Sequence, residues 1–130
     1  MKRILLIAAI PLLACAACQE PDKAISKQDG LYVVDTSMIE NEIIGYNGPT
    51  PVTLYIRDRR IVKVHMQENA DGFRYNQRVR EGIGKAWDGK SLEEAATLEV
   101  DAVSGATFTS NAVIGNVRLG VTYFMEKKKR

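Results

Sequence analysis

Two adjoining stretches near the middle of the chain place apolar residues at every second position. Residues 52–57 alternate in this way, and residues 61–66 resume the alternation with Val62 and Met66 on the apolar side. A period of two indicates strands with one buried face, and two such strands in succession indicate a β-hairpin. Because the connection at residues 58–60 lacks glycine, we expect a longer loop or one built on a type I turn.

Two further stretches repeat apolar residues at helical spacing. Residues 70–88 place Val79 and Ile83 on one face and charged side chains mostly on the others. This spacing predicts an amphipathic helix. Residues 91–96, which begin with serine and carry glutamates in the next positions, predict a short capped turn of helix.

The longest apolar stripe belongs to a helix predicted over residues 110–127. The stripe should pack on the sheet, whereas Asn116 falls toward solvent on the same pattern. Gly115 and Gly120 interrupt this helix and allow two interpretations. They either permit close packing against a neighbour or are simply weak helix formers.

Together with a strand predicted at residues 31–34, these elements indicate an α+β fold, a small antiparallel sheet packed by two main helices. A chain of 130 residues is long enough for one domain with a modest core. We assign residues 31–130 to that domain and residues 18–30, which are polar and broken by proline and glycine, to a tether.

The N-terminus is typical of a secretory signal. Residues 1–17 begin with two cations, continue as an apolar run too short to span a bilayer, and end in small residues and cysteine. Cys15 and Cys18 each approximate a lipoprotein cleavage site, and the sequence does not choose between them. The alternative is a plain cleaved signal with incidental cysteines. Either way we expect the mature protein in the cell envelope, facing the periplasm or exterior, with no disulfide inside the domain.

The net charge says little about binding partners once the signal is removed. The full chain has 18 lysines and arginines against 16 acidic residues, so loss of Lys2 and Arg3 leaves the two signs equal. A neutral protein in this compartment is not expected to bind nucleic acid. The basic end at residues 127–130 is typical of a solvated helix end, and contact with anionic headgroups is the second interpretation.

The stretch with the most chemistry is Asp101-Ala102-Val103-Ser104-Gly105-Ala106-Thr107-Phe108-Thr109-Ser110. It gathers four hydroxyls just before the last helix, and Ser or Thr at such a position is a helix N-cap signal. Gly105 can adopt a positive φ and lets the backbone approach a ligand. Helix N-termini favour phosphate. The residues themselves therefore indicate a phosphate cradle with a hydroxyl available for covalent attachment.

This stretch resembles the flavinylation motif of bacterial FMN-binding domains, which occur in extracytoplasmic subunits of sodium-translocating NADH:quinone reductase and of the Rnf complex. The resemblance follows the pattern Asp-x-x-Ser-Gly-Ala-Thr-x-Thr-Ser. It extends more loosely over residues 30–125 and includes a Gly-Tyr-x-Gly turn with Tyr46. It implies that FMN is joined through its phosphate to Thr107.

The resemblance also implies the roles of the neighbouring residues. Ser104, Gly105, Ala106, Thr109 and Ser110 would surround the FMN phosphate. A Mg²⁺-dependent flavin transferase would install the cofactor from FAD. Asp101 would belong to the sequence that this transferase reads.

The other candidate residues give weaker evidence of a functional role. His65 is the only histidine, so it cannot build a metal site and is typical of a strand surface. A hydrolase with Ser104 as nucleophile and His65 as base is disfavoured, because the sequence shows neither a nucleophile elbow nor a third residue for a catalytic triad. Trp87 and Tyr46 could each stack on a flavin ring. The apolar stripe favours a core position for Trp87, whereas for Tyr46 stacking and a structural role are evenly weighted.

The expected function is electron transfer by a covalent flavoprotein, with membrane or envelope redox proteins as partners. Such a protein would be a redox carrier or a subunit of an oxidoreductase system, with its lipid anchor in the membrane. Two alternatives are an FMN-sensing or storage domain and a structural lipoprotein whose motif is never modified.

Overall fold

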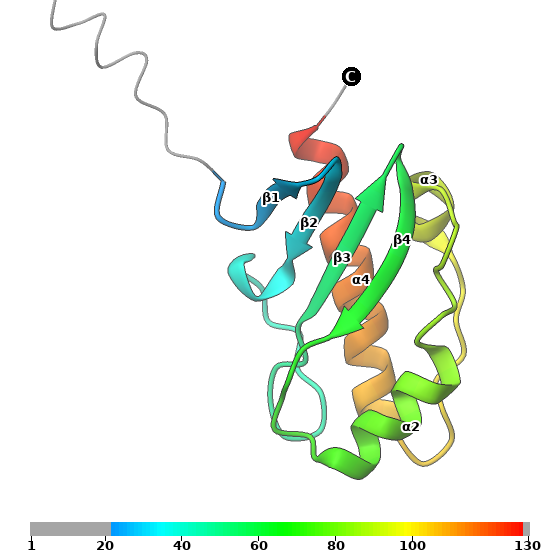
Figure 1. The fold of residues 1–130 in the computed structure, drawn as a ribbon. Coiled ribbons are helices and arrows are strands. Elements are labelled where there is room, and N and C mark those ends of the chain that lie inside the picture. The colour runs from blue at the N-terminus through cyan, green and yellow to red at the C-terminus, as the bar shows by residue number, and fades with distance from the viewer. Residues whose placement is uncertain (1–21, 129–130) are drawn as a thin grey trace, which may run out of the picture.

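The computed structural model describes residues 22–128 and shows an antiparallel four-stranded sheet with helices on one side (Figure 1). The strands are hydrogen-bonded in sequence order, so each pairs with the next along the chain. Antiparallel neighbours can be joined by short loops, as β1 is to β2 and β3 to β4, whereas residues 36–51 form a longer connection between β2 and β3. The strands are β1 (Ile25–Gln28), β2 (Leu31–Asp35), β3 (Val52–Arg57) and β4 (Arg60–Met66).

The long helix α4 (Thr107–Lys127) lies across one face of this sheet, and the shorter helices border it (Figure 1). Helix α2 (Phe73–Ile83) lies near the N-terminal end of α4, whereas α3 (Leu92–Thr97) lies beside β4 and α4. A single turn of 3₁₀ helix, η2 (Thr36–Met38), follows β2. This arrangement confirms the predicted α+β class with two main helices.

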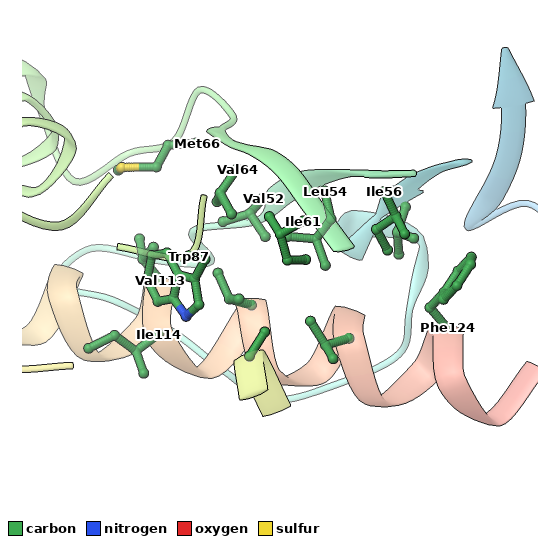
Figure 2. Packing of buried hydrophobic residues seen from close by; sticks show 14 of the residues in the cluster. Val52, Leu54, Ile56, Ile61, Val64, Met66, Trp87, Val113, Ile114 and Phe124 are labelled. Atoms are coloured by element: carbon green, nitrogen blue, oxygen red, sulfur yellow. The ribbon is translucent and has the colours of Figure 1, made fainter. Parts of the chain in front are cut away.

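The hydrophobic core lies between the sheet and α4 (Figure 2). Leu54 is fully buried, and Trp87 is only 1% exposed, so the core interpretation of the tryptophan holds. Phe124 closes the core toward β2 by an edge-on contact with Tyr32, their ring centroids being 5.1 Å apart. Asn116 faces inward, contrary to expectation, because its amide donates to the carbonyl oxygens of Thr50 and Ala112.

The predicted tether contains a strand. Residues Ile25–Gln28 form β1 and pair with β2, so the folded part of the chain begins before residue 31. The loop between them is Asp29-Gly30, and both residues have positive φ. A two-residue loop of this kind matches the natural twist of a hairpin. The Asp-Gly pair thus converts a polar stretch into the edge of the sheet.

The central hairpin is present, but its loop is not the one expected. Asp58 and Arg59 form a two-residue connection and have φ values of 52° and 59°, as in a type I′ turn without glycine. Contacts to α3, which is distant in sequence, hold this strained turn. The Arg59 guanidinium pairs with Glu93 at 2.7 Å, and the Arg59 carbonyl accepts a hydrogen bond from the Leu92 amide.

The alternation in β4 is also interrupted. The register with β3 shifts between Tyr55 and Ile56, so that Ile61 pairs with Ile56 and Val62 is the extra residue of a bulge. Val62 is consequently 44% exposed, whereas Ile61 takes the buried position. The prediction that Val62 lies on the apolar side is therefore wrong.

The two glycines of α4 differ in their surroundings, and this yields a test. A Cβ at Gly120 would lie 2.7 Å from Leu54 Cδ1, whereas one at Gly115 would meet only Ile43 at ordinary contact distances from 3.5 Å. We expect Gly115→Ala to raise the free energy of unfolding by about 0.5–1 kcal/mol through helix propensity. We expect Gly120→Ala to lower it by about 1 kcal/mol, because overpacking outweighs propensity. Urea unfolding followed by Trp87 fluorescence measures both, and stabilisation by both substitutions would contradict this packing.

Within residues 22–128, no helix has the length and apolar character that a membrane span requires.

Candidate functional site

The hydroxyl-rich motif forms a tight turn that leads directly into α4. The Ala106 amide donates to the Val103 carbonyl, and Gly105 between them has a φ of 83°. The helix begins at Thr107, three residues earlier than its periodicity predicts. Ala106 is the N-cap residue and no side chain caps the helix, so the expected Ser or Thr cap is absent.

The four hydroxyls of the motif fall into two pairs. Thr109 and Ser110 are buried, and both hydroxyls are engaged: Thr109 Oγ1 donates to Asp71, and Ser110 Oγ accepts from the Val103 amide at 2.9 Å. Ser104 and Thr107 are exposed. Within residues 22–128, neither of their hydroxyls has a hydrogen-bond partner. The Ser110 hydroxyl therefore holds the turn together and the Thr109 hydroxyl ties it to Asp71, whereas the Ser104 and Thr107 hydroxyls face solvent.

Asp71 connects this turn to the loop that carries Tyr46. Its side chain is 1% exposed. One carboxylate oxygen accepts from the Tyr46 amide at 2.8 Å and from Thr109 Oγ1 at 2.6 Å, and the other accepts from the Asn47 amide at 2.6 Å. Hydrogen bonds to an ionised acceptor are stronger than neutral ones. The carboxylate therefore fixes the Tyr46 loop against the N-terminal turn of α4.

A small aromatic pocket opens where these segments meet. Its volume is about 210 Å³, and its walls are Tyr46, Tyr75, Phe108 and the turn from Gly105 to Thr109. The Tyr46 ring lies 5.3 Å from that of Tyr75 and 6.2 Å from that of Phe108, measured between centroids. Tyr46 and Phe108 are 56% and 66% exposed, respectively. An aromatic surface this open suits a flat ligand that stacks on it.

The predicted site residues mostly converge on this pocket. Five of the predicted site residues line it: Tyr46, Gly105, Ala106, Thr107 and Thr109.

The remaining predicted residues lie around or away from the pocket. Ser104 and Asp101 are exposed on the segment that approaches it and do not line it, whereas Ser110 is buried behind the turn. His65 is exposed on β4, and the described residues include no cluster of three or more metal-ligating side chains.

Three residues of the site did not emerge from the sequence. Asp71 stands in a polar stretch that resembles any surface loop, and Phe108 occupies an unspecified position of the motif. Tyr75 lies four residues before Val79 in the predicted helix at residues 70–88, and this spacing indicates only a place on its apolar face. The available signal was weak in each case, because burial and pairing between distant segments do not appear in local periodicity.

A larger cavity of about 500 Å³ lies between β4 and α2 but contains no residue of the motif. Its floor is apolar and includes Trp87 and Val113. The chemistry of the chain therefore concentrates at the smaller aromatic pocket.

The electrostatics of that pocket favour an anion. The first-turn amides of α4 have no acceptors within the helix, and the helix dipole adds positive character at the same end. Arg78 of α2 lies over the turn and donates from Nη1 to the Ser104 carbonyl at 3.3 Å. The site thus combines a free hydroxyl, positive charge and exposed aromatic rings.

A family model described as an FMN-binding domain matches residues 45–122. The match begins at the Gly45-Tyr46 turn and ends within α4. It therefore includes every residue that lines the aromatic pocket.

Proposed function

The chain belongs to the FMN-binding domain family, and we propose that it carries FMN joined by a phosphoester to Thr107 and transfers electrons outside the cytoplasmic membrane. The observation that carries this proposal is the state of the Thr107 hydroxyl. It is exposed at the pocket and has no partner within the described residues, whereas Thr109 and Ser110 are buried and bonded. Ser104 is equally exposed but does not line the pocket.

The residues present fit FMN. Thr107 and the first-turn amides of α4 offer attachment and hydrogen bonds for a phosphate, and the aromatic side chains offer surfaces for a flat ring. The pocket is too small to enclose a whole flavin, since its volume is about 210 Å³. Part of the ring would therefore face solvent, as a carrier that meets redox partners requires.

Attachment would be a phosphoryl transfer from FAD. The Thr107 oxygen would bond to the phosphorus of the FMN half, the anhydride bond to AMP would break, and the hydroxyl proton would leave. The protein would gain one FMN less one water, with AMP as the other product. The Mg²⁺-dependent transferase would catalyse this step and would read Asp101 together with the motif. Exposure of both Asp101 and Thr107 supports access by such an enzyme.

Once attached, the flavin supplies the redox chemistry, because its ring accepts and donates electrons. The contribution of the chain is binding and orientation. The Val103–Ala106 turn would hold the attachment point, and Tyr46, Tyr75 and Phe108 would orient the ring. Asp71 would keep the Tyr46 wall in place. A covalent tether suits an envelope protein, since a dissociable flavin would be lost to the surroundings.

The proposal places the protein in the cell envelope. Its lipid anchor would be on Cys15 or Cys18, and both lie outside the described residues. Membrane or envelope redox proteins would supply and accept the electrons.

Replacing Tyr46 with leucine tests the stacking role. Its loop is held through backbone amides, so the loop should persist without the ring. An aromatic pair is worth about 0.5–1.5 kcal/mol, so Tyr46→Leu should weaken free FMN and free riboflavin about 2- to 12-fold alike. Titration of the unmodified protein, followed by flavin fluorescence, measures this. Tyr55→Leu, on β3 and outside the pocket, should change neither affinity, and equal binding by Tyr46→Leu and wild type would refute stacking.

Electron transfer needs its own test. The flavinylated protein, mixed without oxygen with energised membranes from its host, should lose the absorbance of oxidised flavin within seconds. The Thr107→Ala protein serves as the control for flavin carried by the membranes. A flavin that stays oxidised would instead favour the sensing or storage function.

A further inference from the structure

We propose that Arg78 binds the phosphate of the flavin nucleotide, an inference that rests on the proposed function because it assigns a residue to the same ligand. Neither the motif nor the periodicity of the chain points to this arginine. Its position relative to Gly105 does.

Close packing brings α2 onto the turn. A Cβ at Gly82 would lie 2.6 Å from Val103 Cγ2, so the glycine lets the helix approach the segment just before Ser104. Arg78 stands four residues earlier in α2 and therefore faces the same side. Its Nη1 lies 2.6 Å from the position that a Cβ on Gly105 would take. The guanidinium thus covers Gly105 directly.

The charge of Arg78 is not neutralised by the protein. Within residues 22–128, Arg78 has no carboxylate partner, whereas Arg59 pairs with Glu93 and Arg118 with Glu99. Its hydrogen bond to the Ser104 carbonyl, at 3.3 Å, is a long one. A guanidinium has five donors in a planar fork that matches the oxygens of a phosphate. Most of these donors are therefore available.

The attachment point lies within reach of this cation. Thr107 follows Gly105 by two residues, a chain distance of at most about 7 Å. The first-turn amides of α4 approach the same point from the helix side. Arg78 would therefore face a phosphate on Thr107 from one side while the helix N-terminus faces it from the other. The side chain is exposed, so its contribution should fall with salt.

Arg80 provides a matched control. It belongs to the same helix and is also exposed, but it lines the larger cavity beside β4, whereas Arg78 lies against Gly105 and Ser104 of the turn. Arg80→Gln therefore removes one positive charge from α2 at a distance from the motif.

The test compares FMN with riboflavin, which lacks the phosphate, on protein made without a flavin transferase. Wild type should bind FMN more tightly than riboflavin. Arg78→Gln should lower FMN affinity about 10-fold, as expected for a charged hydrogen bond, and leave riboflavin within 2-fold. The FMN affinity of Arg78→Lys should fall between those of wild type and Arg78→Gln, and Arg80→Gln should bind FMN as wild type does. The FMN preference should shrink as salt increases.

Three results would overturn the proposal. These are equal losses of FMN and riboflavin in Arg78→Gln, an equal effect of Arg80→Gln, and a wild-type protein with no preference for FMN up to roughly millimolar concentration. The assay does not depend on covalent attachment. A phosphate preference that needs Arg78, together with an unmodified mass after production with a flavin transferase, would retain this inference and reject the covalent function.

Discussion

Replacing Thr107 with alanine should abolish covalent flavin while leaving the fold intact. The Thr107 oxygen is the proposed attachment atom, so its removal leaves no exposed hydroxyl of the motif at the pocket. Thr109 lines the pocket but is buried and bonded to Asp71, and Ser104 does not line the pocket. The side chain is exposed and has no hydrogen-bond partner within the described residues. Its loss should therefore change the free energy of unfolding by no more than about 0.5 kcal/mol.

Two measurements check this prediction. Flavin fluorescence of the denatured protein should be absent for Thr107→Ala after production with a flavin transferase, and urea unfolding should match wild type. Thr107→Ser, which keeps the oxygen, should restore covalent flavin. A Thr107→Ala protein that still carries flavin after denaturation would refute the assignment of the attachment residue.

Replacing Asp71 with alanine should lower the free energy of unfolding more than any other single substitution at the site. The substitution leaves the Tyr46 and Asn47 amides and the Thr109 hydroxyl without their acceptor. A buried donor left unpaired costs about 1–3 kcal/mol, and water can reach the two loop amides. We therefore expect a loss of about 2–4 kcal/mol in the free energy of unfolding.

The effect of Asp71→Ala should also be local. Hydrogen exchange at the Tyr46 and Asn47 amides should accelerate far more than exchange in the centre of β3. Thr109→Val removes one of the three hydrogen bonds to Asp71 and should lower the free energy of unfolding by less than Asp71→Ala does. Glu68→Gln replaces an exposed acid two residues after the end of β4 and should have little effect on the exchange of these amides. Unchanged protection of both loop amides in Asp71→Ala would show that the carboxylate does not hold the loop.

Regular periodicity explains why much of the fold was predictable. The hairpin and both main helices bury one face each, so their apolar residues recur at spacings that the sequence displays directly. The short helix α3 was visible for another reason. Its Ser91 and Glu94 form a capping box, in which each side chain bonds the backbone of the other residue.

The predictions for the sheet are wrong where the geometry of a turn outweighs the composition of the strands. The strand β1 has a polar exposed surface and resembles a linker in composition, although Asp29-Gly30 after it is a strong hairpin signal. The turn at Asp58-Arg59 had no such signal. Its strained backbone is held by contacts to Leu92 and Glu93, which are distant in sequence.

The site was predictable as far as its motif and no further. Local residue types indicated a phosphate cradle, and the structure does place Thr107 beside an aromatic pocket with Tyr46. Pairing across the chain was not readable. The bond from Thr109 to Asp71 joins residues 38 positions apart, and the Arg78 bond to Ser104 spans 26. Such contacts depend on how the helices pack.

The most direct test of the covalent flavin is the intact mass of the mature protein produced together with a flavin transferase. The account predicts a gain of one FMN less one water, located by peptide mapping to Thr107. An unmodified mass, in cells where a known flavinylated domain is fully modified, would contradict it.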